Sequence, residues 1–183
     1  MYFELGKEHI LDVKGYDHIM FVLALCSLYQ LSHWKNVLIL VTAFTIGHSV
    51  TLALSTFDLI SINKSLIEFL IPITILITAI VNIIKGPGGE NNNVKINYAF
   101  ALFFGLIHGM GFSNYLKSLL GKSSNIIVEL FSFNLGLEFG QILIVVAFLL
   151  LGFVMTSLLN VSRRDWNLAV SSGVIAVAIT LMI

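Results

Sequence analysis

Imidazole and carboxylate side chains stand inside runs of apolar residues at several places in this chain. One of them is His48, which lies in the middle of an apolar run from Val37 to Phe57 that is long enough to cross a bilayer. Charged side chains at the centre of a membrane helix cost about 2.5–3.5 kcal/mol on insertion scales. His48 therefore needs a partner, and another segment has to supply it.

His108 has a similar setting in Phe104–Phe112, where Gly105, Gly109 and Gly111 surround it. Small residues let a neighbouring helix, a metal ion or a substrate come close to the backbone of a membrane helix. The alternative interpretation is a small-residue packing face on which His108 only donates a hydrogen bond.

Asp17 and His18 stand side by side at the start of another apolar run, and His9 precedes them by eight and nine positions. Successive residues on a helix point about 100° apart, so one of the pair can bind a ligand while the other orients it. His9 can fold back over the same site if a turn at Gly15 breaks the helix. Alternatively, Asp17 caps a helix and His18 lies at the level of the headgroups.

Asn134, Glu138 and Gln141 are spaced i, i+4 and i+7, which places them on one stripe of a helix. Glu138 has apolar neighbours on both sides, so its carboxylate needs a cation or has to carry a proton. Thr45 adds a hydroxyl one turn before His48.

Imidazoles and carboxylates without thiolates are typical ligands of borderline divalent metals such as nickel, cobalt and zinc. A bundle without water cannot leave these groups unpartnered, and a shared metal ion satisfies them together. Because binding needs neutral imidazole, it should weaken as the pH falls through the imidazole range. The predicted ligands are His9, Asp17, His18, His48, His108 and Glu138, with Thr45, Asn134 and Gln141 as supporting polar groups.

The composition predicts the fold that positions these residues. The chain has 183 residues, 57% of them hydrophobic and 11% charged, whereas soluble domains carry about 25% charged residues. We therefore predict an all-α, polytopic membrane protein with one domain over 1–183, a short interfacial segment at 4–15 and a glycine-rich loop at 86–93. About six spans are expected, at 16–31, 36–57, 65–84, 97–120, 126–158 and 167–183.

Charge and cysteine content exclude several classes. The net charge is zero, which gives no basis for nucleic-acid binding, and the single cysteine, Cys26, excludes an intrachain disulfide and a cysteine-based zinc cluster. Residues 1–15 contain too many charges for the apolar core of a signal peptide. The ten basic residues divide evenly between the two sides, so the positive-inside rule leaves the orientation open.

Four segments, 9–21, 44–52, 104–112 and 133–141, resemble those of the HupE/UreJ family, in the same order. The resemblance implies a small bacterial protein of the cytoplasmic membrane, a nickel or cobalt permease that serves hydrogenase and urease. It also implies metal handling at the six predicted ligands. The expected partners are the metal ion and the lipid bilayer, with self-association or a metalloenzyme-maturation partner left open.

Two functions of different classes follow. The first is transport of a divalent metal ion, in which the ion binds weakly enough to be released. The second is an intramembrane zinc-dependent hydrolase with a metal-activated water, in which Ser49 polarises an oxyanion and Glu138 is the general base. A metal sensor or assembly factor without turnover is a third. One tightly held zinc per chain favours the enzyme, and exchangeable metal favours transport.

Overall fold

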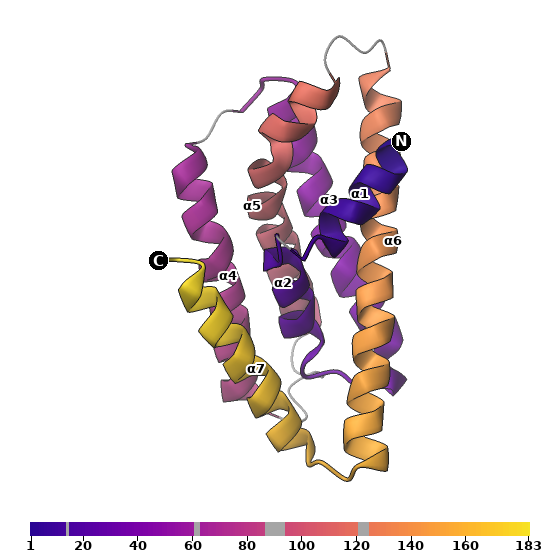
Figure 1. The fold of residues 1–183 in the computed structure, drawn as a ribbon, viewed down its shortest axis with the longest axis vertical. Helices are drawn as coiled ribbons and strands as arrows, with labels where there is room; N and C mark the ends of the chain where they lie inside the picture. The colour runs from indigo at the N-terminus through magenta and orange to yellow at the C-terminus, as the bar shows by residue number, and fades with distance from the viewer. Residues whose placement is uncertain (14, 61–62, 87–93, 121–124) are drawn as a thin grey trace.

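The fold was analysed in a computed structural model, which describes residues 1–13, 15–60, 63–86, 94–120 and 125–183. None of these residues is in a β-strand, and the long helices run alongside one another as a bundle (Figure 1). The predicted all-α class is confirmed. The longest helices are α3 (Trp34–Thr56), α4 (Lys64–Lys85), α5 (Val94–Leu120) and α6 (Ile126–Phe153), which continues into a π-helical turn, η3 (Val154–Leu158).

Four helical segments of the described chain are long and apolar enough to cross a membrane. They cover Leu31–Thr56, Lys64–Lys85, Ile96–Ser113 and Ile126–Leu158, and they correspond to the predicted spans 36–57, 65–84, 97–120 and 126–158. The chain is therefore a helical membrane protein. At the end of α4, Gly86 has a positive φ of 65°, which glycine adopts without strain. Residues 87–93 of the predicted loop lie outside the described residues.

The first predicted span, 16–31, does not form as one crossing helix. It contains α2 (Asp17–Cys26), whose 10 residues extend about 15 Å, half of the hydrocarbon core. Before it comes α1 (Tyr2–Leu11), which crosses α6, while α2 lies in the middle of the bundle (Figure 1). Glycine and charged residues between the two apolar stretches account for the break.

The last predicted span, 167–183, corresponds to α7 (Arg163–Thr180), which packs against α4 and α2. The helix begins earlier than predicted because the Ser162 side chain accepts a hydrogen bond from the backbone N–H of Asp165, at 3.1 Å. Helix α7 is not one of the four described helical segments that are long and apolar enough to cross a membrane. By helix length and composition, the described residues therefore contain four candidate spans instead of the predicted six.

Helices α3 and α5 pack with their backbones in contact. A Cβ at Gly105 would overlap the carbonyl of Phe44, and one at Gly109 would overlap the carbonyl of His48. The predicted role of these glycines, close approach of another helix, is confirmed. The contact brings His48 and His108, which α3 and α5 carry, to the same level of the bundle.

Glycines also allow α1 and α6 to pack with their backbones in contact. A Cβ at Gly6 would overlap the carbonyl of Phe133, and a Cβ at Gly136 would overlap the carbonyl of Phe3. The helix that approaches the glycines of α6 is therefore the short α1. This packing fixes His9, in the last turn of α1, inside the bundle.

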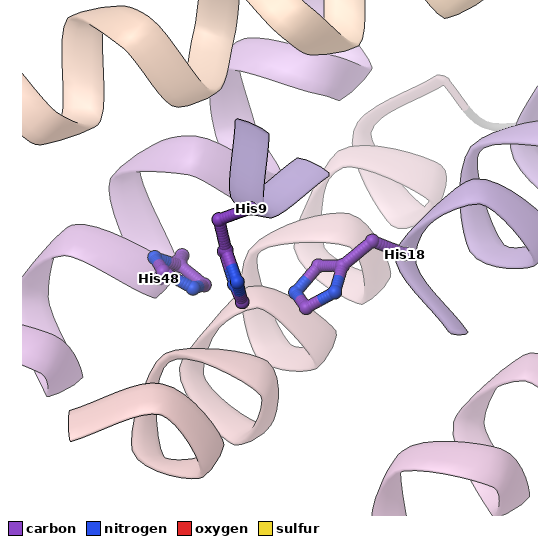
Figure 2. A group of neighbouring side chains, drawn as sticks. All are labelled: His9, His18 and His48. Atoms are coloured by element: carbon purple, nitrogen blue, oxygen red, sulfur yellow. The ribbon is translucent and has the colours of Figure 1, made fainter. Parts of the chain in front are cut away.

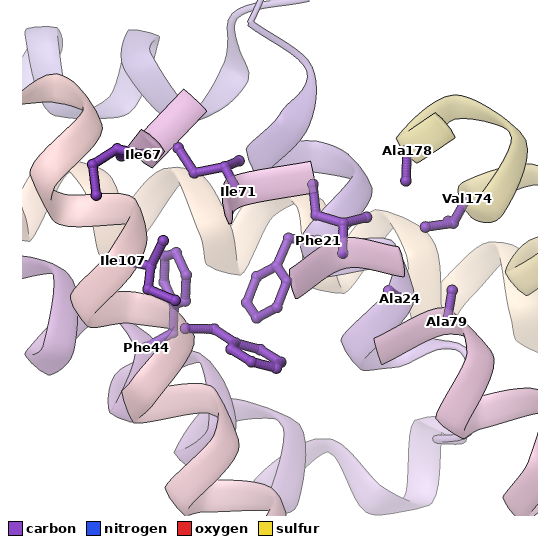
Figure 3. Packing of buried hydrophobic residues seen from close by; sticks show 11 residues of the cluster. Phe21, Ala24, Phe44, Ile67, Ile71, Ala79, Ile107, Val174 and Ala178 are labelled. Atoms are coloured by element: carbon purple, nitrogen blue, oxygen red, sulfur yellow. The ribbon is translucent and has the colours of Figure 1, made fainter. Parts of the chain in front are cut away.

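A buried network of side-chain amides and hydroxyls holds the C-terminal end of α2. The Asn82 amide donates to the carbonyl of Ala24 at 2.6 Å and to Ser27 Oγ at 3.0 Å, and Asn167 donates to the Asn82 carbonyl at 2.9 Å. These donors satisfy carbonyl groups that a helix end leaves free. Phe21 packs with Phe44 in the core between the helices (Figure 3), so α2 is fixed along its length.

Candidate metal centre

Four of the five histidines meet at the start of α2. The ring centroid of His18 lies 4.6 Å from that of His9, 6.1 Å from that of His48 and 5.2 Å from that of His108. Figure 2 shows the rings of His9, His18 and His48 turned toward one another. Because α1, α2, α3 and α5 each contribute one ring, the cluster depends on the break between α1 and α2.

The ligand atoms form two overlapping groups. In one group the atoms of His9, His18 and His48 all lie within 4.8 Å of one another, and in the other the same holds for Asp17, His18 and His108. Donors bound to one ion at about 2.1 Å are at most about 4.2 Å apart. Small side-chain adjustments would bring either group around an ion, and His18 belongs to both.

The imidazoles are buried, yet several of their nitrogens have no hydrogen-bond partner among the described residues. The exposed fraction of the residue is 0% for His48, 1% for His108 and 5% for His18. Buried polar atoms are nearly always hydrogen-bonded, so these need an explanation, and a bound metal ion would account for one lone-pair nitrogen of each ring. The atoms are Nε2 of His9, Nε2 of His18, both ring nitrogens of His48 and Nδ1 of His108.

Thr74 determines which nitrogen of His108 carries the proton. The Thr74 hydroxyl donates its hydrogen to the carbonyl of Ile71 at 2.7 Å. It also lies 3.1 Å from Nε2 of His108, and at that contact it can only accept. Nε2 of His108 therefore carries the hydrogen, and the lone pair is on Nδ1, the nitrogen without a partner.

Asp17 orients His18 in the same way. Its Oδ1 lies 3.1 Å from Nδ1 of His18 and accepts the backbone N–H of His18 at 2.9 Å. An ionised carboxylate only accepts hydrogen bonds, so Nδ1 of His18 donates and Nε2 keeps its lone pair. Of the two roles that the sequence allowed, the geometry gives Asp17 the orienting one, while a carboxylate oxygen of Asp17 also lies close enough to serve as a ligand in the second group.

The polar stripe predicted on one helix, with Glu138 and Gln141, lies on α6 and contacts α3. Thr42 donates to Oε1 of Glu138 at 2.6 Å, and Thr45 donates to Oε1 of Gln141 at 2.8 Å. The Asn134 amide donates to the backbone carbonyl of Leu130, one turn earlier in α6, at 2.8 Å.

Glu138 belongs to neither group of metal-capable side chains. The structure therefore does not bring it together with the imidazoles, and its role as a ligand stays a prediction. The hydroxyl of Ser49, which the hydrolase hypothesis expected to polarise an oxyanion, donates to the carbonyl of Thr45 at 2.7 Å. The fifth histidine, His33, lies on η1 (Leu31–His33), beside Tyr29.

Thr74 was not among the residues predicted from the sequence. Threonine in a membrane helix usually bonds to its own backbone, and Thr74 does so. In the sequence, Thr74 and Thr78 are two threonines in an apolar stretch after Pro72, and nothing connects Thr74 with His108.

A bundle of membrane-crossing helices with a buried histidine cluster at a helix break defines a polytopic membrane protein with a metal-capable centre. The sequence model of one family, described as HupE / UreJ protein, matches residues 1–183. The chain therefore belongs to the HupE/UreJ family. Comparisons with curated proteins and with solved structures give no match.

Proposed function

We propose that this protein transports a divalent transition-metal ion across the bacterial cytoplasmic membrane, with nickel or cobalt as the ion that membership of the HupE/UreJ family implies. The observation that carries the proposal is the set of buried, unpartnered imidazole nitrogens from four helices. Neutral imidazole suits nickel, cobalt and zinc alike, so the ligand set defines the class of ion rather than one metal.

Two overlapping ligand groups fit transport better than permanent storage. An ion held by His9, His18 and His48 can move to Asp17, His18 and His108 while His18 stays bound. Conduction requires sites that bind an ion well enough to admit it and weakly enough to release it. The shared ligand makes such a transfer a short step.

The break between α1 and α2 supports the same function. Together the two helices have 20 residues, enough to extend about 30 Å, so they can form one discontinuous crossing. Transporters place substrate and ion sites at such interrupted helices near the bilayer midplane. Here the interruption separates His9 from Asp17 and His18.

Metal uptake into proteoliposomes tests the proposal. We expect the parent protein to take up nickel or cobalt ions and the His48→Ala and His108→Ala variants to lose most of that uptake. His33→Ala is the matched control, because His33 is outside the cluster, and should keep it. Uptake that is equal in all four proteins would reject the proposal, and so would a single zinc per chain that does not exchange with added metal.

A further inference from the structure

A cavity of about 580 Å³ opens between α1 and α5, next to the histidine cluster. Its walls include Glu8, His9 and Asp12 from the end of α1, and Phe112 and Tyr115 from α5. Glu8 is in the last turn of α1 and Asp12 is the residue that follows the helix, and both line the cavity. Both residues are exposed.

His9 separates this cavity from the cluster. It is one of the residues that line the cavity, and its ring centroid lies 4.6 Å from that of His18 and 6.2 Å from that of His48. Its Nε2 is buried and has no hydrogen-bond partner among the described residues. An ion that occupies the cavity would therefore meet His9 before it reaches the other imidazoles.

The carboxylates continue from the cavity toward the cluster. A Cβ built on Gly15 would lie 3.8 Å from Oδ2 of Asp12 and 3.9 Å from Oδ1 of Asp17. Asp17 in turn belongs to the ligand group of His18 and His108. Glu8, Asp12 and Asp17 thus form a series of carboxylates, and the described residues that line the cavity include no lysine or arginine.

We propose that Glu8 and Asp12 form an outer cation site, from which a hydrated divalent metal ion passes to His9. This inference rests on the proposed transport function. Carboxylates hold a hydrated ion loosely, while imidazole is the better ligand once water has been lost. The negative charges also raise the local concentration of cations at the mouth of the cavity.

The test is the nickel concentration that gives half-maximal uptake into proteoliposomes, measured at about 10 mM and at about 1 M ionic strength. A single negative charge about 8 Å from a divalent ion in water changes binding about fivefold. The Glu8→Gln/Asp12→Asn double variant should therefore raise the half-saturating concentration by about five- to twenty-fivefold at low salt. The difference should shrink to about twofold or less at high salt, where the Debye length is about 3 Å.

Two matched variants serve as controls. Glu4→Gln removes a carboxylate from the same helix that pairs with Lys7 and does not line the cavity, so it should leave the half-saturating concentration unchanged. Asp12→Glu keeps the charge and should behave like the parent. The maximal uptake rate should be the same in all these proteins, because the histidine cluster is intact.

The outcomes separate this inference from the proposed function. Absence of uptake by the parent protein would reject transport itself. Uptake by the parent with the same half-saturating concentration in the double variant would reject the outer site alone. A lower maximal rate in the double variant would also overturn it, since the carboxylates would then act on the fold or on the cluster.

Discussion

Thr74→Val tests most sharply how the protein prepares His108 as a ligand. Valine has nearly the shape of threonine but lacks the hydroxyl that lies 3.1 Å from Nε2 of His108. In the variant, the Nε2–H group loses its acceptor in a buried site. The imidazole can then shift its proton to Nδ1, which removes the lone pair that faces the cluster.

The expected size of the effect follows from that one hydrogen bond. A buried donor left without a partner costs about 1–3 kcal/mol, and loss of a group that orients a metal-binding histidine lowers affinity about 10–100-fold. We expect a rise of about 10–100-fold in the dissociation constant for nickel or cobalt, measured by titration calorimetry of the protein in detergent.

Thr78→Val is the matched control. Thr78 is one turn further along α4, and its hydroxyl donates to the carbonyl of Thr74 at 2.8 Å. Its removal should leave the dissociation constant within about twofold of the parent value. The account of His108 would be refuted if Thr74→Val also bound within twofold of the parent, or if both variants weakened binding equally.

Three further predictions concern orientation, packing and the anchor of α2. Asp17→Ala should lower metal affinity about 10–100-fold by freeing the His18 ring, whereas Asp165→Ala should not; equal affinities in calorimetry would contradict the orienting role. Gly105→Ala should destabilise the protein by about 1–3 kcal/mol in thermal unfolding, because its Cβ overlaps α3, while Gly173→Ala, with open space around it, should not. Asn82→Leu should lower the unfolding temperature by removing donors to the end of α2, and an unchanged temperature would show that the network is dispensable.

Much of the centre could be anticipated from sequence because hydrocarbon offers no hydrogen bonds to an imidazole. His48 and His108 lie in apolar runs, so each had to find a partner inside the protein, and the structure places both beside His18. His9 was expected to join them only if the chain broke near Gly15, and it does break there. Their role as metal ligands stays a prediction.

Other features depend on tertiary contacts that the sequence does not display. Glu138 was grouped with the imidazoles because an isolated carboxylate in an apolar helix needs a partner. That partner is Thr42 of α3, whose hydroxyl donates to Oε1 of Glu138. The position of α1, whose segment was predicted to lie at the membrane interface, also depends on packing, because the glycines of α6 receive this helix of only 10 residues.

The most direct test of the central claim is an anomalous-scattering map of crystals loaded with nickel or cobalt. The account predicts a peak about 2.0–2.1 Å from imidazole nitrogens of His18 and of His48 or His108. A strong peak at Glu138 or His33, with those three imidazoles empty, would contradict it.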